Sequence, residues 1–220
     1  VFGVLFVTHP TLEALRRVSF EYHPSLLPMH RGPSSVNWPI AMGSTKTGLT
    51  IFWPNEGLDE GPILLQKTCD IGPDETLADI YFKKLYPMGV DAMIESLDLV
   101  KADDAPQIKQ NLDEGSYESW FGKAQAEIDW SKPSAQIYNT IRAANPQPGA
   151  WTKNNGVTVQ IFNSQLIELA VGDPGTILKS SDDGLVIATG DDGGILISRV
   201  RSDGEGKVSA SEYAASCKLG

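Results

Sequence analysis

The chain has 220 residues, a mass of 23.8 kDa and a formal net charge of -10, and 41% of its residues are hydrophobic. This composition is that of a globular protein and excludes a disordered or collagen-like chain, while the acidic charge argues against general nucleic-acid binding. No apolar stretch approaches the roughly 18 residues of a membrane span, so no membrane partner is expected. Cys69 and Cys217 form no Cys-x-x-Cys pair, and we expect both to be free thiols in a reducing, cytoplasmic compartment.

The first half of the sequence predicts an α/β domain with a mostly parallel sheet. Val4 to Val7 is a continuous, β-branched apolar run, which is typical of a fully buried strand. His23 to Gly32 carries two prolines and a glycine, so we expect a shaped loop rather than a helix. The other expected elements are strands at 18–22, 48–53 and 63–67, helices at 37–42 and 74–86, and a turn-rich loop at 54–61.

The region from Pro87 to Gly115 is expected to close this first domain. Pro87 and Gly89 predict an interruption after the helix at 74–86. Apolar residues then recur at helical spacing and are expected to pack in the core, namely Val90, Met93, Ile94, Leu97 and Val100. The polar segment from Lys101 to Gly115 predicts a linker, which divides the chain into domains 1–115 and 116–220.

The second domain is expected to be a small barrel-like β domain. A helix is predicted over 131–144, with Ser131 as its N-cap. Ser209 to Glu212 matches a capping box that opens a last short helix. Between them, clusters of glycine and aspartate separate short alternating runs at 157–162, 176–179, 185–189 and 195–200. Strands of this length and spacing favour a small antiparallel barrel.

His23 and Asp59 are the first candidates for chemistry, because each lies in a loop that directly follows a predicted strand. In α/β sheets, function is concentrated in such loops. Pro24 and Pro28 stiffen the loop of His23, and Gly57 and Gly61 flank the acidic stretch that holds Asp59. A carboxylate beside an imidazole orients it and favours its protonated form, so the pair could stabilise an oxyanion and accept a proton. The alternative is a structural histidine and a solvated acidic loop.

Several other site classes lack their sequence signals. The sequence contains no Gly-x-Gly-x-x-Gly or Walker loop, which argues against a dinucleotide or ATP site. Metal-ligand spacing of histidine, cysteine and carboxylates is absent, so no metal is expected. Gly-x-Ser-x-Gly is also absent, which argues against an α/β-hydrolase nucleophile.

Two motifs make the chain recognisable. Tyr22-His23-Pro24-Ser25-Leu26-Leu27-Pro28, followed by Arg31-Gly32, resembles the signature of the 10-formyltetrahydrofolate-dependent formyltransferase family. The stretch Gly57-Leu58-Asp59-Glu60-Gly61 matches the family's second element, and residues 145–152 match the element that opens its C-terminal domain. The resemblance implies a Rossmann-like first domain that lacks its N-terminal part, with Val4 to Thr8 as one of its later strands, followed by the barrel-like domain.

The resemblance also implies a donor and a set of site residues. The formyl donor would be 10-formyltetrahydrofolate, with its pteridine side against Ser25, Leu26, Leu27 and Pro28 and with Asp59 close by. His23 would stabilise the tetrahedral oxyanion, and Asp59 would support His23 and manage the proton. The acceptor stays open among water, a thiol, an amine and initiator tRNA.

Two branches of the family are relevant to this sequence. The hydrolase domain of formyltetrahydrofolate dehydrogenase is favoured by Tyr22-His23-Pro24, His30-Arg31-Gly32 and Ile51-Phe52-Trp53. An activity of the dehydrogenase type, or of a sugar or small-molecule formyltransferase, is therefore favoured. Methionyl-tRNA formyltransferase is the alternative branch.

Glu21 departs from the family, which commonly has asparagine at this position as a third catalytic group. Together with the missing N-terminal part, Glu21 keeps open a non-catalytic, truncated folate-binding relative. A third alternative is RNA binding by the second domain, based on its basic residues Lys153, Lys179, Arg199, Arg201 and Lys207.

Overall fold

The computed structural model describes residues 19–216, so the strand predicted at Val4 to Val7 and the thiol of Cys217 lie outside the described residues. The described chain forms two compact units. The first comprises residues 19–39, 44–73 and 78–120, and the second comprises 40–43, 74–77 and 121–216. Cys69 is not in a disulfide. Within residues 19–216, no helix is both long and apolar enough to span a bilayer.

The sheet of the first unit consists of β1 (Glu21–His23), β2 (Lys46–Phe52) and β3 (Ile63–Asp70), in that order. Both pairings are antiparallel, so the prediction of a mostly parallel sheet is wrong for the described residues. A short loop connects β2 directly to β3, and such a connection joins antiparallel strands because a parallel pair needs a long crossover. The fold is nevertheless mixed α/β, as expected.

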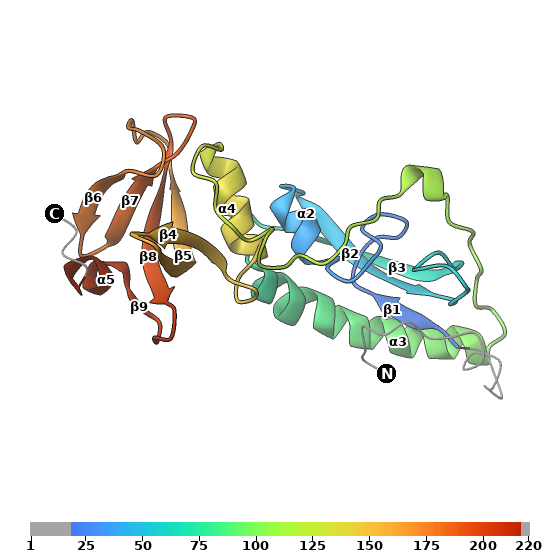
Figure 1. Ribbon diagram of the computed structural model, residues 1–220. Coiled ribbons are helices and arrows are strands. Elements are labelled where there is room, and N and C mark those ends of the chain that lie inside the picture. Colours follow the sequence, from blue (N-terminus) through green and yellow to red (C-terminus); the bar gives the residue numbers. More distant parts are fainter. Residues whose placement is uncertain (1–18, 217–220) are drawn as a thin grey trace. The chain divides into compact units, whose positions relative to one another are not determined.

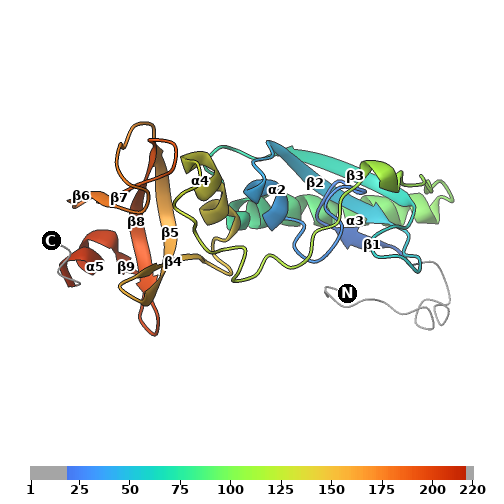
Figure 2. The ribbon, with the colours of Figure 1, turned by 45° about the horizontal axis from the view of Figure 1, so that its top comes forward.

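The two faces of this sheet have different roles, because successive side chains of a strand alternate between faces. Leu49 and Ile51 of β2 are buried in a core cluster with Leu64 and with Ala92 of the long helix α3 (Tyr86–Lys101). Figures 1 and 2 show α3 running alongside the three strands. His23 is paired with Thr50, between these core positions, and therefore belongs to the opposite face.

The helical region continues through the predicted interruption. A π-helix, η1 (Asp79–Leu85), leads directly into α3, and Pro87 falls in the first turn of α3, where a missing N–H is tolerated. Gly89 is buried against the ring of Tyr22, and a Cβ there would lie 2.7 Å from Tyr22 Cε2. The glycine therefore allows close packing of α3 on the sheet instead of ending the helix.

The apolar stripe of α3 packs only in part. Met93 and Val100 contact the core cluster, as predicted. Val90, Ile94 and Leu97 are 44%, 55% and 45% exposed, so the prediction of core packing is wrong for these three.

The segment predicted to be a linker instead packs on the first unit. Ile108 exchanges two backbone hydrogen bonds with Ile63, at 2.7 and 2.9 Å. A short 3-10 helix, η2 (Leu112–Glu114), follows, and Tyr117 then forms a parallel bridge with Arg31. These backbone bonds fix the segment beside the loops that carry His23 and Asp59.

The second unit contains a six-stranded antiparallel sheet. Its main path is β4-β5-β8-β7-β6, and β9 pairs with β8. The strands are β4 (Ala150–Asn154), β5 (Val157–Ile167), β6 (Ile177–Ser181), β7 (Gly184–Ala188), β8 (Gly194–Ser202) and β9 (Val208–Ser209). The antiparallel arrangement agrees with the prediction, but among the described residues no pairing joins β4 to β6, so the sheet is not a closed barrel.

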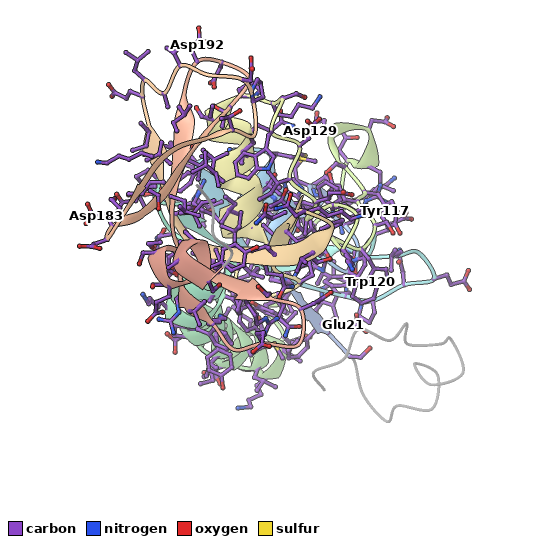
Figure 3. All side chains as sticks on the ribbon, turned by 60° about the vertical axis from the view of Figure 1, so that its left-hand side comes forward. Glu21, Tyr117, Trp120, Asp129, Asp183 and Asp192 are labelled. Atoms are coloured by element: carbon purple, nitrogen blue, oxygen red, sulfur yellow. The ribbon has the colours of Figure 1, made fainter. Side chains whose placement is uncertain are left out.

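The short helices of the chain begin close to the predicted residues. The helix predicted at 37–42 is α2 (Asn37–Ala41), and that predicted at 131–144 is α4 (Ser134–Ala143). The N-cap of α4 is Pro133 and not the predicted Ser131, and the carboxylate of Asp191 accepts the N–H of Ser134. The capping box before α5 (Ala210–Ser216) is confirmed by reciprocal hydrogen bonds between Ser209 and Glu212. In Figure 3, Asp183 and Asp192 point outward from the turns that flank β7.

Candidate functional site

The structure brings His23 and Asp59 together at the sheet face opposite α3. His23 ends β1, and Asp59 lies in the loop between β2 and β3. His23 Nδ1 is 3.7 Å from Asp59 Oδ2, and their side chains are 9% and 15% exposed. This separation is too long for a direct hydrogen bond, yet both atoms can contact one polar atom placed between them at about 2.8 Å.

The ring of His23 has a fixed orientation. Its Nε2 lies 2.9 Å from the backbone oxygen of His30. A carbonyl oxygen only accepts hydrogen bonds, so Nε2 carries the hydrogen and Nδ1 faces Asp59. Burial lowers the pKa of His23, and the Asp59 carboxylate offsets this only partly. The expectation that Asp59 would favour the protonated imidazole is therefore correct in sign but outweighed by burial, so the resting imidazole is neutral at pH 7.

Two hydrogen bonds and the local backbone conformation position Asp59. Its Oδ2 accepts the N–H of Gly32 at 2.8 Å. Its backbone oxygen accepts a hydrogen bond of 2.9 Å from Gln110 Nε2, which also donates to the oxygen of Gly61 at 2.7 Å. Gly61 has to be a glycine, because a Cβ there would lie 1.7 Å from the oxygen of Trp53. The backbone of Asp59 is left-handed, with φ 55°, a conformation that aspartate tolerates better than most residues.

The loop from Ser25 to Pro28 is tied to the sheet through its backbone. Thr50 Oγ1 donates to the oxygen of Ser25 at 2.7 Å and accepts the N–H of Leu27 at 3.0 Å. Gln66 Nε2 donates to the oxygen of Leu27 at 2.8 Å. Ser25 and Leu27 are buried, whereas Leu26 and Pro28 are partly exposed. The first two therefore shape the loop, and contact of the four residues with a folate stays a prediction.

Glu21 lies two residues before His23 on β1 and therefore on the same face of the strand. Burial raises its pKa, and the negative charge of Asp59 raises it further. Glu21 is thus electrically linked to the candidate site, although no role follows from this link alone.

Sequence reasoning missed several residues that build the site. Gln110, Ser116 and Glu118 belong to the predicted linker and its continuation, yet all three bond to the two site loops. Arg31 Nη1 also joins these loops, through an ion pair of 2.6 Å with Glu60. Nothing local in the sequence marks these contacts, since each joins residues far apart in the chain.

The arrangement suits acid–base chemistry. Within residues 19–216, no group of three or more histidine, cysteine, aspartate or glutamate side chains could hold a metal ion. A neutral imidazole nitrogen and a carboxylate oxygen converge on one point, from the end of β1 and from the loop between β2 and β3. Such a pair can take a proton from one bound group and deliver it to another.

Comparison with known proteins places these loops in a family. The model described as "Formyl transferase" matches residues 2–97, and that described as "Formyl transferase, C-terminal domain" matches residues 121–218. Mitochondrial 10-formyltetrahydrofolate dehydrogenase of Mus musculus is 38% identical over 187 residues, which is 84% of this chain and 20% of that protein. The chain thus spans about one fifth of the length of this relative.

Other relatives share more of their own length with this chain. Methionyl-tRNA formyltransferase of Syntrophus aciditrophicus (strain SB) is 37% identical over 198 residues, covering 90% of this chain and 63% of that protein.

Among solved structures, HypX of Aquifex aeolicus in complex with tetrahydrofolic acid has a TM-score of 0.75 at 23% identity, over 94% of this chain and 36% of that one. The N-formyltransferase of Helicobacter canadensis with folinic acid and dTDP-3-aminofucose has a TM-score of 0.66 at 24% identity, over 81% and 65% of the two chains. These two likenesses concern the fold. The family models, which match both units, establish that the chain belongs to the formyl transferase family.

Proposed function

We propose that this chain carries the part of a formyl transferase that releases the formyl group of 10-formyltetrahydrofolate, with the hydrolase domain of a formyltetrahydrofolate dehydrogenase as the nearest type of activity. The observation that carries the proposal is the convergence of His23 Nδ1 and Asp59 Oδ2, from the two loops that bear the family motifs. The dehydrogenase relative supports the choice of donor and branch, since its name contains that folate.

The proposed reaction needs one proton to be moved and returned. A nucleophile attacks the formyl carbon, and its proton passes to the pair formed by neutral His23 and ionised Asp59. The positive charge that His23 gains stabilises the negative charge that develops on the formyl oxygen. The same proton then reaches the departing folate nitrogen, so the pair returns to its initial state and the proton balance closes.

The loop from Ser25 to Pro28 and the residues behind it would hold the donor. Leu26 and Pro28 supply partly exposed apolar surface, and the clamps from Thr50 and Gln66 keep the loop from moving. A rigid loop is what a site needs if the reacting carbon is to stay within reach of both catalytic groups.

Methionyl-tRNA formyltransferase activity is the second candidate. The relative from Syntrophus aciditrophicus favours it, because it matches 90% of this chain and 63% of its own length. The net charge of -10 and the residues that resemble the dehydrogenase branch place this candidate second. The acceptor distinguishes the two, since the first activity uses water or a small molecule and the second uses the amino group of a charged tRNA.

The test is to incubate the 220-residue chain with 10-formyltetrahydrofolate and to follow tetrahydrofolate and formate. We expect release by the wild-type chain and its loss in His23→Ala and in Asp59→Asn, because each variant removes one member of the pair. A parallel reaction with methionyl initiator tRNA identifies the second activity by formylmethionine on the tRNA. Binding of the donor without release in either reaction would identify the non-catalytic relative and contradict the proposal.

A further inference from the structure

A second pair of imidazole and carboxylate lies behind His23 and has no part in the reaction proposed above. His30 Nδ1 is 3.1 Å from Glu118 Oε2, and both side chains are 11% exposed. A carboxylate only accepts, so Nδ1 of His30 carries the hydrogen of this bond. Polar groups buried to this extent depend on their partner, because removing one member leaves the other unsatisfied.

The backbone of His30 is held in an unusual conformation. Its φ of 56° is left-handed, which is disfavoured for a residue with a Cβ. The N–H of His30 donates to Ser116 Oγ at 2.9 Å, and the N–H of Arg31 donates to the oxygen of Ser116 at 3.0 Å. The N–H of Glu118 donates to the oxygen of Arg31 at 3.1 Å. The peptide group between His30 and Arg31 is therefore anchored on both sides by residues 116–118.

The oxygen of this same peptide group holds His23. It accepts from His23 Nε2 at 2.9 Å, which is the contact that turns Nδ1 toward Asp59. If the peptide rotated, Nε2 would lose its acceptor, and the hydrogen could move to either ring nitrogen. The conformation of His30 thus decides which nitrogen of His23 meets the substrate.

We propose that His30 and Glu118 are positioning residues, which fix the peptide that selects the tautomer and the ring orientation of His23. The catalytic consequence rests on the proposed function, whereas the consequence for the tautomer does not. The contrasting explanation is that the pair only fastens residues 116–118 to the first unit and contributes to stability alone.

Nitrogen NMR of the imidazole rings separates these explanations without an activity assay. The chain has three histidines, and the signals of His23 are identified by their loss in His23→Asn. In the full wild-type chain we expect one neutral tautomer of His23, with the hydrogen on Nε2. In Glu118→Ala we expect a mixture of the two tautomers, because the His30 ring loses its partner and the peptide is then held by the backbone bonds to residues 116–118 alone.

The kinetic test uses the same variants with 10-formyltetrahydrofolate. We expect Glu118→Ala to lower kcat by about 10- to 100-fold, the range known for partners that orient metal-binding histidines, since the imidazole is oriented in a comparable way here. KM for the donor should change by less than about threefold, and the acid limb of the pH profile, which follows His23, should shift. Glu118→Gln should recover much of kcat, because the amide oxygen still accepts the hydrogen of His30 Nδ1.

A matched control is Glu95→Ala, which breaks the ion pair of 2.6 Å between Glu95 and Lys67 in the same unit, away from His23. It should leave the tautomer, kcat and the pH profile unchanged. If Glu118→Ala fails to fold, His30→Asn removes the ring while suiting the left-handed backbone, and the same readouts apply.

The proposal is overturned if the variants lower the melting temperature but leave the tautomer of His23 and the pH profile as in the wild type. Absence of formyl release by the wild-type chain would contradict the proposed function instead, and the NMR spectra would still decide the role of His30 and Glu118.

Discussion

Two acidic turns that look alike in the sequence have opposite chemical surroundings. Asp59 lies between Gly57 and Gly61, and Asp191 lies just before Gly193. Asp191 accepts hydrogen bonds from the hydroxyls of Thr189 and Ser134, at 2.7 and 3.1 Å, and from the backbone N–H groups of Ser134 and Gly193. Among the described residues, the carboxylate of Asp59 accepts one hydrogen bond, from the N–H of Gly32, and its Oδ2 lies 3.7 Å from His23 Nδ1.

The number of hydrogen bonds that each carboxylate accepts distinguishes a structural carboxylate from one that is available to a substrate. The hydroxyl of Thr189 and then the donors on Ser134 and Gly193 lower the pKa of Asp191. The carboxylate of Asp191 is therefore used in hydrogen bonds to the start of α4 and within its own turn. Asp59 keeps Oδ1 without a donor among the described residues, and its backbone rather than its carboxylate is bonded to Gln110. Oxygen atoms left unused by the fold are available to a substrate.

The largest effect is expected when the same charge is removed from both turns. Asp59→Asn should lower formyl release by at least about 100-fold, the lower end for loss of a general acid or base, with little change in stability. Asp191→Asn should leave release unchanged and lower the free energy of unfolding by about 1 kcal/mol, as for a lost helix cap. Initial rates and urea unfolding of both variants give the result. Equal rates for the two would mean that Asp59 is only structural.

The next effect concerns the backbone that presents Asp59. Gly61→Ala should lower the free energy of unfolding by about 3 kcal/mol, since its Cβ would lie 1.7 Å from a backbone oxygen that cannot move freely. Gly206→Ala is the matched control, because no atom lies within 4 Å of its Cβ, and it should change the free energy of unfolding by no more than about 0.5 kcal/mol. Urea unfolding measures both. Equal losses in the two variants would contradict the close approach at Gly61.

Local patterns predicted most of the elements. The run predicted as a strand from Gly48 to Trp53 lies in β2 as far as Phe52, and the capping box at Ser209 opens a helix, because alternation and capping depend on neighbouring residues. The pairing of His23 with Asp59 was predicted from two loops that follow predicted strands and then from the family motifs, and the structure places the two side chains together.

The rest depends on contacts that no local pattern encodes. Glu118 bonds to His30 across 88 positions of the sequence, and Gln110 bonds to Gly61 across 49. Because these partners are distant in the sequence, the polar stretch that contains Gln110 has the pattern of a linker, although it packs on the first unit. Strand direction failed for a similar reason. A short loop between β2 and β3 requires antiparallel pairing, but the expectation of a parallel sheet came from the α/β class as a whole.

A smaller effect on stability and activity is expected for Gln110, which tests whether the segment predicted to be a linker holds the turn of Asp59. Gln110 is 5% exposed and donates to two backbone oxygens, so Gln110→Ala should leave both unsatisfied and lower the free energy of unfolding by about 2 kcal/mol. It should also slow formyl release several-fold, because Asp59 loses an anchor. Gln107→Ala, three residues earlier in an exposed stretch, is the control and should do neither. If both variants behave alike, the segment does not position Asp59.

The smallest expected effect concerns the charge of His23. Its folded pKa lies below the ordinary value of about 6.5 because of burial, so between these two values the unfolded chain binds more protons than the folded chain. The contribution of the neutral imidazole to the free energy of unfolding is therefore complete above about pH 6.5, and it is lost as the pH falls toward the folded pKa. The total loss is about 1.4 kcal/mol for each pH unit that separates the folded from the unfolded pKa. The difference in unfolding free energy between wild type and His23→Asn, followed by urea unfolding from pH 7.5 to 5, isolates this contribution from the other histidines. Asp59→Asn should enlarge the loss, since its carboxylate is what partly restores the pKa of His23. A difference that stays constant over this range would mean that His23 is not buried as a neutral group.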